Sequence, residues 1–402
     1  MTTENENTET TDTLKPVVNT SAHIQRHELS GQQVEAMDAV IKWLKSSANI
    51  SFRLGGYAGT GKTTLLRHFE EATEKTAAFC SFTGKAAHVM TKKGLYASTI
   101  HRLIYNVIEE GDGTFTFKLK HRSELECDVI VVDEASMISK ELLNDLMSFS
   151  IPLLFVGDPG QLEPVGDDPY LMRDPDYVLT EIKRQGVDNP IIDLATAIRM
   201  TSTLPSKGVK LVSPDGQSGY FVVDKVAIPD KALTQCDQVI CATNKAREHL
   251  NAKIRMLTNQ RSMLVPPSEG DKVICLRNNQ FLGVFNGMIG TIKKVYSQDE
   301  IRSCDRIAGA YHMDIETDTG NVMRRLPIWP EMFKSQPDKE SKCPRKMTEW
   351  TYGYAITCHK SQGSEWENVV VFDQWMPPKV WDVGRWRYTA VTRASKKVFI
   401  GV

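Results

Sequence analysis

The sequence contains no apolar run long enough to span a membrane and no recognisable secretory signal. Its eight cysteines form no C-x-x-C pair, and no nearby histidines complete the spacing of a zinc site. These absences argue against a membrane protein, a disulfide scaffold and a zinc-binding module. We therefore expect reduced, mostly buried thiols in a cytosolic protein.

The chain also lacks an excess of charge of either sign, with 49 basic and 50 acidic side chains. A strongly basic domain often indicates a nucleic-acid partner, and the whole chain shows no such bias. If it binds nucleic acid, its positive charge must be gathered on one face. The 402 residues, 41% of them hydrophobic, suggest two to four globular domains.

The beginning of the chain differs from the rest in composition. Residues 1–28 are rich in Thr, Asn and Glu and poor in apolar side chains, which predicts a disordered tail. Ser30 can then cap a helix. The apolar positions of that helix include Val34, Met37, Val40, Ile41 and Leu44.

Short apolar runs then alternate with helix-like stretches. This alternation predicts an α/β fold in which parallel sheets are covered on both faces. The strand candidates are residues 50–54, 77–82, 128–132 and 153–156, followed by a second set at 238–242, 353–356, 368–372 and 397–400. Two sets of strands imply two lobes.

Two stretches interrupt this alternation. Asp112-Gly113 precedes alternating Thr and Phe within residues 104–119, which predicts a β-hairpin. Residues 271–350 contain short β-rich runs with turn signals such as Asn286-Gly287. We expect this second stretch to form a small β-barrel inserted into the second lobe.

Residues 56–63, Gly-Tyr-Ala-Gly-Thr-Gly-Lys-Thr, fit the P-loop pattern between a strand and a helix. Its glycines allow the backbone to wrap closely around phosphates, and the helix N-terminus favours negative charge. Lys62 should reach the β- and γ-phosphates of a nucleotide, and Thr63 should ligate Mg²⁺. The pattern therefore predicts ATP and Mg²⁺ as cofactors.

Asp133 and Glu134 follow the strand candidate at residues 128–132. A carboxylate at a strand end beside a P-loop can hold Mg²⁺, and a neighbouring glutamate can polarise an attacking water. We therefore expect Asp133 to be a metal residue and Glu134 the catalytic base.

The strand at residues 153–156 ends in the polar segment 157–165. Gln161 in this segment could contact the γ-phosphate or orient water, although a Gly/Pro turn with incidental polar residues is the alternative. Arg184 and Arg393 also stand in polar segments. Arginines beside a P-loop can neutralise charge that develops on the γ-phosphate and can link hydrolysis to lobe closure.

Together these segments resemble the helicase motifs of superfamily 1, and within it the RecD/Dda-like group that moves 5′ to 3′. The resemblance covers almost all of residues 29–402, with the segments in the order of the family. The matching segments are Gln33, 56–63, 82–87, 98–101, 133–136, 157–165, 179–185, 354–363 and 388–393.

The resemblance implies two RecA-like P-loop lobes with two insertions. Lobe 1 would comprise residues 29–195, with a hairpin at about 103–122 that acts as the pin of the family. Lobe 2 would comprise residues 196–270 and 350–402. Residues 271–349 would form an inserted SH3-like β-barrel.

The resemblance also assigns roles to single residues. Gln33 would read the adenine, and Arg184 and Arg393 would be arginine fingers. The catalytic group would be Lys62, Glu134, Gln161, Arg184 and Arg393. The nucleotide-binding group would be Gln33, Gly56, Ala58, Gly59, Thr60, Gly61, Lys62, Thr63, Thr64, Gly363 and Glu365, with Thr63 and Asp133 on the metal. The nucleic-acid-binding group would be Thr83, Lys85, His101, Asn244, Thr357, His359, Lys360, Ser361 and Phe115.

Some assignments stay open at the level of sequence. Phe82 stands where the family usually has proline, and it could pack in the core or stack on a base. Phe115 or Phe117 could present an apolar face to the last base pair, or both could pack against the barrel. Further candidate contacts to the strand are Lys118, Lys120, Arg122, Arg277, Arg324 and Arg345.

The leading hypothesis is an ATP-dependent 5′-to-3′ DNA helicase that acts in replication, recombination or repair. We expect single-stranded DNA and forked or tailed duplex as partners, with a single-strand-binding or replication protein as a further candidate. We also expect a monomer in the cytoplasm, which would be the bacterial host cytoplasm for a phage protein. The alternatives are a remodeller that displaces proteins with little unwinding, and a P-loop phosphotransferase acting on a small substrate.

Overall fold

The computed structural model describes most of the chain after the tail. The described residues are 29–46, 48–109, 115–163, 171–182, 189–259, 261–263, 266–279, 282–304, 306–318, 320–334, 338, 341–377 and 381–402. The tail predicted at residues 1–28 lies outside them. Among the described residues, no helix is long and apolar enough to cross a membrane.

The first lobe is built on a six-stranded parallel sheet with the order β3-β2-β6-β7-β1-β8. Its strands are β1 (Ser51–Gly56), β2 (Ala77–Ser81), β3 (Ala97–Thr99), β6 (Val129–Asp133), β7 (Leu153–Gly157) and β8 (Tyr177–Leu179). Its helices are α1 (Gly31–Ser46), α2 (Lys62–Arg67), α3 (Phe69–Thr73), α4 (Gly84–Lys92), α5 (Ile100–Ile104) and α6 (Lys140–Ser148). One apolar core lies on each face of this sheet, which explains why β6 is buried from Val129 to Val132.

Helix α1 begins where the sequence predicts it, with the Ser30 hydroxyl accepting a weak hydrogen bond of 3.4 Å from the Gln33 main chain. Its buried face differs in part from the predicted one. Met37 and Val40 are buried as expected, but Val34 is 38% exposed and Trp43 is buried in its place. The prediction for Val34 was wrong because the helix turns a Gln33-containing face toward the P-loop.

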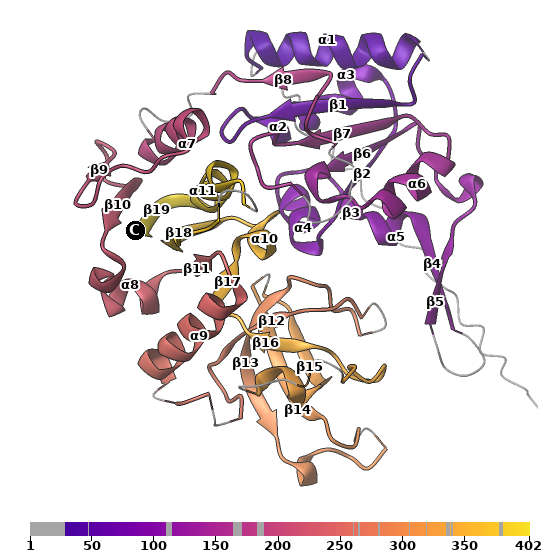
Figure 1. Cartoon of the computed structure of the whole chain (residues 1–402). Coiled ribbons are helices and arrows are strands. Elements are labelled where there is room, and N and C mark those ends of the chain that lie inside the picture. The colour runs from indigo at the N-terminus through magenta and orange to yellow at the C-terminus, as the bar shows by residue number, and fades with distance from the viewer. Residues whose placement is uncertain are drawn as a thin grey trace, which may run out of the picture.

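The predicted hairpin is present in lobe 1. Strands β4 (Tyr105–Glu109) and β5 (Phe115–Leu119) pair antiparallel and project from the lobe (Figure 1). Tyr105 donates a hydrogen bond to the Asp145 carboxylate of α6, which fixes the hairpin base. The role of the hairpin as a pin stays a prediction.

The second lobe has its own six-stranded sheet with the order β17-β11-β18-β19-β10-β9, parallel except for β9. Its strands are β9 (Lys210–Val212), β10 (Gly219–Val223), β11 (Gln238–Cys241), β17 (Ala355–Thr357), β18 (Trp366–Phe372) and β19 (Ala394–Gly401). Its helices are α7 (Pro190–Thr201), α8 (Asp230–Gln235), α9 (Asn244–Asn259), α10 (Cys358–Ser361) and α11 (Val383–Val391). Within the described residues, the short 3-10 turns are η2 (Arg122–Glu124), η3 (Ala135–Met137), η4 (Lys225–Ala227), η5 (Gln298–Glu300) and η6 (Pro330–Phe333).

Helix α7 lies across the predicted boundary between the lobes at residues 195 and 196. Its buried side chains Ile191, Leu194 and Ile198 share one core with Trp386 of α11. The whole helix therefore packs with lobe 2, and the connection between the lobes precedes it.

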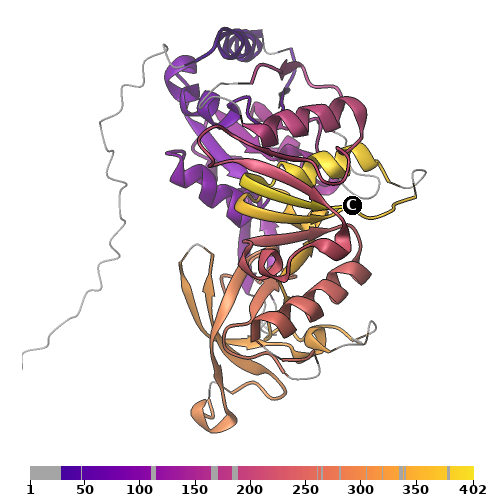
Figure 2. The same cartoon turned by 90° about the vertical axis from the view of Figure 1, so that its left-hand side faces the viewer.

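Residues 271–350 form a five-stranded antiparallel sheet below lobe 2 (Figure 2). Its strands are β12 (Lys272–Cys275), β13 (Ile289–Tyr296), β14 (Tyr311–Thr317), β15 (Val322–Ile328) and β16 (Trp350–Tyr352), in the order β15-β14-β13-β12-β16. A bridge between Ile328 and Thr348 brings the β15 edge next to the segment that leads into β16. The prediction that this part is a small SH3-like barrel stays a prediction. We call this part the insert below.

A buried ion pair holds the insert against lobe 2. Arg255 of α9 and Asp271 before β12 are both fully buried, with 2.9 Å between Arg255 Nη2 and Asp271 Oδ2. Asn259 and Tyr354 donate further hydrogen bonds to Asp271 Oδ1. The main-chain amide and the hydroxyl of Ser268 donate to Asp271 Oδ2. Burial raises the pKa of Asp271, but these hydrogen bonds outweigh it and bring the pKa below its ordinary value.

Candidate nucleotide site and strand channel

The P-loop has the local geometry that its glycines predict. Gly59 and Gly61 adopt positive φ angles of 80° and 77°, and Gly61 directly precedes α2. Lys62 Nζ donates to the Gly56 carbonyl at 2.6 Å and more weakly to Tyr57 at 3.3 Å. The Lys62 ammonium therefore lies inside the loop, where it could bind a phosphate.

Gln33 lies behind the P-loop. Its Nε2 donates to the carbonyls of Thr60 at 3.0 Å and Gly61 at 3.2 Å, and its Oε1 accepts from Ser30. The side chain is buried and supports the loop from the rear. Thr60 is also buried, with its hydroxyl on the Tyr57 carbonyl. The role of Gln33 in reading adenine stays a prediction.

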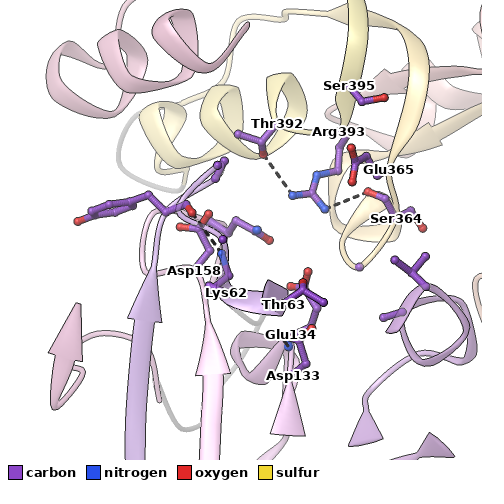
Figure 3. A pocket seen from close by; sticks show the side chains of 18 of the residues that line it. Lys62, Thr63, Asp133, Glu134, Asp158, Ser364, Glu365, Thr392, Arg393 and Ser395 are labelled. Atoms are coloured by element: carbon purple, nitrogen blue, oxygen red, sulfur yellow. Dashed lines mark hydrogen bonds between the residues drawn. The ribbon is translucent and has the colours of Figure 1, made fainter. Parts of the chain in front are cut away.

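Asp133 and Glu134 stand at the C-terminal end of β6, opposite Thr63 (Figure 3). Burial raises the pKa of Asp133, while the Lys62 charge opposes the rise. Burial and the neighbouring Asp133 charge raise the pKa of Glu134, against the opposing charges of Arg393 and Lys62. Glu134 has an unusual positive φ of 54°, which turns the chain sharply after the strand.

Asp158 and Gln161 lie at the end of β7 and face the same cavity. Asp158 Oδ1 accepts from the Gly160 main chain at 2.8 Å, which shapes the turn. Gln161 is 5% exposed, and its Oε1 has no hydrogen-bond partner among the described residues. Glu134 Oε2 is likewise buried without a described partner. Both atoms are thus left available to a ligand in the cavity.

Lobe 2 supplies the opposite wall of this cavity. Arg393 follows α11, and its guanidinium donates to the carbonyls of Thr389 and Ser364 and to the Thr392 hydroxyl at 3.0–3.2 Å. Arg393 and Glu365 extend from lobe 2 toward Lys62, Thr63 and Glu134 (Figure 3). The resulting cavity has a volume of about 590 Å³, and both lobes line it.

Most of the predicted nucleotide and catalytic residues meet in this cavity. Gly363 approaches α4 so closely that a Cβ would lie 3.1 Å from the Thr83 hydroxyl, which requires glycine there. Arg184 lies outside the described residues. The predicted residues that line the cavity are Ala58, Gly59, Gly61, Lys62, Thr63, Thr64, Asp133, Glu134, Gln161, Gly363, Glu365 and Arg393.

Tyr388 of α11 connects the two lobes at the P-loop, a role that the sequence reasoning missed. Its hydroxyl accepts from the Ala58 main chain at 2.9 Å and donates to Asp158 Oδ2 at 2.8 Å. Burial, the Asp158 charge and this hydrogen bond keep the pKa of Tyr388 far above its ordinary value, so the hydroxyl stays protonated. The only signal in the sequence is that Tyr388 and Asp158 each fall inside a matched motif.

The end of β7 makes further hydrogen bonds to lobe 2. Thr389 Oγ1 accepts from the Leu162 main chain at 2.9 Å, and Gln362 Nε2 donates to the Leu162 carbonyl at 2.8 Å. Arg385 of α11 donates to the Gln161 carbonyl at 3.2 Å. A motion of lobe 2 relative to lobe 1 would therefore act directly on the Gln161 segment.

The donor set of the cavity fits a nucleotide with Mg²⁺. Two unpartnered buried oxygens face a P-loop lysine and an arginine from the other lobe. Thr63 and Asp133 would supply two oxygen ligands to the metal. This small number suits Mg²⁺, which usually retains waters and binds substrate phosphates.

A second cavity of about 90 Å³ brings together predicted residues of the strand track. Thr83 and His101 of lobe 1 line it from one side, and His359 and Lys360 of lobe 2 from the other. Burial lowers the pKa of both histidines, which favours their neutral form. Phe82 also lines this cavity, and it packs against the lobe 1 core as well. Both of the placements considered for Phe82, at the core and at the strand, therefore stay open.

The other predicted track residues are placed differently. Lys85 forms an ion pair of 2.8 Å with Asp318 of the insert, and its ammonium lies 4.3 Å from the centre of the Trp366 ring. Ser361 is fully buried, with its hydroxyl on the Cys358 carbonyl. The prediction of Ser361 as a direct strand contact is wrong for this arrangement because the hydroxyl points into lobe 2. Asn244 is exposed at the start of α9, and Thr357 directly precedes α10.

A series of ring contacts leads from this cavity to the hairpin. The ring centres of Phe82 and His101 are 6.4 Å apart, those of His101 and Tyr105 5.7 Å, and those of Tyr105 and Phe117 6.0 Å. Phe117 is 51% exposed, and its ring contact is with Tyr105 of β4, the partner strand in the hairpin. Phe115 lies in β5, but its side chain is outside the described part of the structure.

The basic residues outside the motifs are mostly at the surface. Lys120 and Arg122 donate to main-chain carbonyls near the hairpin, and Arg324 lies 3.7 Å from the Asp314 carboxylate. Lys118, Arg277 and Arg345 are exposed. Their part in strand binding stays a prediction.

A P-loop in one lobe that faces an arginine from a second lobe across a shared cavity is the arrangement of a two-lobed P-loop nucleotide-binding protein. Comparison with known families narrows this class. Residues 28–213 match the model of an AAA domain, and residues 352–400 match that of a UvrD-like helicase C-terminal domain.

Curated relatives show the same likeness. The chain is 29% identical to the ATP-dependent RecD2 DNA helicase of Deinococcus radiodurans over 86% of its length and 46% of the relative's. It is 30% identical to the ATP-dependent DNA helicase dda of enterobacteria phage T4 over 57% of each chain. The chain thus spans about half the length of these relatives.

Solved structures share the fold. A Bacteroides Pif1 bound to single-stranded DNA superposes with a TM-score of 0.54 at 18% identity, over 91% of this chain and 92% of that one. A Pif1 helicase from Candida albicans gives 0.50 at 19% identity, over 93% and 94%. The chain is thus similar to DNA helicases of the RecD and Dda kind in both of its matched domains, and it shares the fold of the Pif1 structures.

Proposed function

We propose that this chain is an ATP-dependent DNA helicase that translocates 5′ to 3′ on single-stranded DNA and unwinds duplex. The observation that carries the proposal is the shared cavity, in which Lys62 and Arg393 come from different lobes. ATP would hold the lobes together, and loss of the γ-phosphate would release them. The names of the RecD2 and dda relatives support both the activity and DNA as the substrate.

The chemistry follows from the residues around the cavity. Lys62 would leave the Gly56 carbonyl to bind the β- and γ-phosphates, and Thr63 with Asp133 would hold Mg²⁺, which neutralises charge on those phosphates. Glu134 would accept a proton from the attacking water. Arg393 would stabilise negative charge on the γ-phosphate, with Arg184 as the second proposed finger.

Movement would arise because the nucleotide cavity and the strand cavity both lie between the lobes. Gly363 faces the nucleotide while Lys360, three residues earlier, lines the strand cavity. A shift of α10 with lobe 2 would thus change both sites at once. The hairpin would act as the pin that splits duplex, and the insert would be an SH3-like barrel.

The wider setting of the proposal comes from the relatives. The 5′-to-3′ direction and a role in replication, recombination or repair rest on the RecD and Dda likeness. Pif1 structures in complex with single-stranded and forked DNA support such partners. We propose that the protein works as a monomer in the cytoplasm and meets a single-strand-binding or replication protein on its track.

The direct test is the dependence of ATP hydrolysis on single-stranded DNA. We expect hydrolysis to rise at least about tenfold with a dT oligonucleotide, because the strand would bridge the lobes and complete the site around Arg393. An Arg393→Ala control should lose this stimulation. Hydrolysis that is indifferent to single-stranded DNA would contradict a motor and favour a phosphotransferase.

A further inference from the structure

The insert contributes a side of the strand cavity that none of the motifs accounts for. Phe285, Asn286 and Asn278, from the loop between β12 and β13, line the cavity together with the motif residues. The Phe285 ring packs on Gly84 at the start of α4, where a Cβ would lie 3.4 Å from the ring. The insert therefore reaches across to lobe 1 at this point, near α4 and α10 (Figure 1).

Four of the residues that line this cavity carry aromatic rings, and Lys360 is the one lysine or arginine among the residues of its wall. Rings from all three parts of the molecule line it, namely Phe82 and His101, His359, and Phe285. Burial lowers the pKa of both histidines, so their rings are largely uncharged near neutral pH. Lys360 is a cation on the wall, and its Nζ already donates to Asn286 Oδ1 at 2.6 Å. Such a lining suits a flat, uncharged aromatic group better than a phosphate.

The two asparagines add amide groups that can donate hydrogen bonds. Asn286 Oδ1 accepts from Lys360, and Asn278 Oδ1 accepts from the Asn286 main chain at 2.7 Å. Each asparagine therefore retains its Nδ2 amide, which makes no hydrogen bond within the described residues. Amide N–H groups can bond the ring nitrogens or carbonyl oxygens found on the edge of every nucleobase.

We propose that this cavity is a nucleobase slot, in which Phe285 of the insert stacks on one base of the bound strand and Asn278 and Asn286 contact its edge. The proposal rests on the proposed function, because it assumes that a single strand runs between the lobes. Because every base offers a face and an acceptor, the slot would require a base without selecting its identity.

The consequence is that a strand without bases would bind poorly. The probes are a fluorescein-labelled dT 10-mer and a 10-mer of the same length made of abasic sites, titrated without ATP so that no translocation occurs. For the unaltered protein we expect the abasic strand to bind about tenfold or more weakly, in line with the usual contribution of base stacking on an aromatic ring. Equal affinity for the two strands would overturn the slot.

Variants of the insert separate stacking from folding. Phe285→Leu keeps an apolar side chain on Gly84 but removes the ring, and Asn286→Ala alters an exposed residue. Each should weaken binding of the dT strand several-fold and leave binding of the abasic strand unchanged. The ratio of the dT affinity to the abasic affinity should therefore fall. Tyr96→Ala is the matched control, since it removes an 88% exposed ring outside the cavity, and it should leave the ratio unaltered.

The results distinguish this inference from the proposed function. If Phe285→Leu and Asn286→Ala weakened both strands equally, the insert would act on the backbone and the slot would be rejected while the motor stood. If neither strand bound the unaltered protein, the proposed function would fail together with the slot. A preserved dT-to-abasic ratio in both variants would also reject the slot.

Discussion

In the proposed mechanism, Arg393 is the residue on which the coupling of hydrolysis to lobe position depends. It contacts main-chain groups of lobe 2 while it lies across the cavity from the P-loop. Lys62, by contrast, belongs to the loop that would bind the phosphates directly. The two cations would therefore have separable tasks. Arg393 would act in catalysis, whereas Lys62 would act in both nucleotide binding and catalysis.

We expect Arg393→Ala and Lys62→Ala both to abolish most ATP hydrolysis. An arginine finger typically contributes about 10³–10⁵ in rate, so the loss in Arg393→Ala should be of that order. Nucleotide affinity, measured with a fluorescent ATP analogue, should be retained better in Arg393→Ala than in Lys62→Ala. An equal loss of nucleotide binding in both variants would refute the finger assignment.

Arg255 and Asp271 make a second prediction at this scale. Both side chains are fully buried, and removal of one partner leaves an uncompensated charge at a typical cost of about 3–5 kcal/mol. Arg255→Ala should therefore lower the midpoint of thermal unfolding by several degrees. Arg53→Ala, which breaks a pair with roughly a third of each side chain exposed, should change stability by about 1 kcal/mol or less.

The same network should be sensitive to acid. The pKa of Asp271 is lowered in the folded protein, so its carboxylate stabilises the fold above the unfolded pKa of about 3.9. That contribution is lost as the pH falls through the folded pKa, because the protonated group loses its charge. As the pH is lowered from about 5 toward about 1, the window in which a carboxylate with a lowered pKa loses its contribution, the thermal midpoint should fall more for the unaltered protein than for Asp271→Asn.

At the scale of elements, α11 contacts both the P-loop and the end of β7. Tyr388 carries the central pair of hydrogen bonds, to Ala58 and Asp158. Tyr388→Phe would remove the hydroxyl and leave a part-buried amide and a buried carboxylate without their partner, a loss worth about 1–3 kcal/mol. The helix would then transmit lobe position to the P-loop less effectively.

We expect Tyr388→Phe to lower the stimulation of ATP hydrolysis by single-stranded DNA about fivefold to a hundredfold, as that energy implies. Hydrolysis without DNA should change less, because Lys62 and Glu134 keep their places. Tyr177→Phe, which removes a hydroxyl bonded to Glu35 between α1 and β8, is the control. A proportional decrease with and without DNA in Tyr388→Phe would argue for a purely structural role.

The hairpin is an element whose contribution can be removed cleanly. It pairs only with itself and is anchored through Tyr105 below its tip. Deletion of residues 109–116 should abolish duplex unwinding but spare ATP hydrolysis stimulated by single-stranded DNA, if the hairpin is a pin. Retained unwinding would favour another separating element, and loss of both activities would indicate a wider structural role.

These elements show how far sequence reasoning reaches. The strands predicted at residues 128–132 and 153–156 were right to within one residue, because fully buried parallel strands give continuous apolar runs, as in β6 and β7. The P-loop and the residues after β6 follow from local patterns. The contacts of Tyr388, Phe285 and Lys85 could not be predicted, since each joins segments more than 190 residues apart. Local periodicity carries no information about such pairs.

At the scale of the whole molecule, the two lobes line one cavity that we propose binds a nucleotide, and together with the insert they line a second that we propose binds a strand. The near-neutral net charge of the chain does not conflict with strand binding, because the channel needs only local cations such as Lys360. The insert is fixed to lobe 2 through Arg255 yet reaches lobe 1 through Phe285 and Asp318. Lobe closure would therefore change both the contacts between the insert and lobe 1 and the position of Arg393.

The measurement that tests the account most directly is ATP-dependent strand displacement on duplexes that carry only a 5′ tail or only a 3′ tail. We predict displacement of the 5′-tailed duplex and none of the 3′-tailed one. Displacement of only the 3′-tailed duplex would contradict the direction while leaving the motor. If neither strand were displaced while single-stranded DNA still stimulated hydrolysis, the chain would be a remodeller and the helicase account would be wrong.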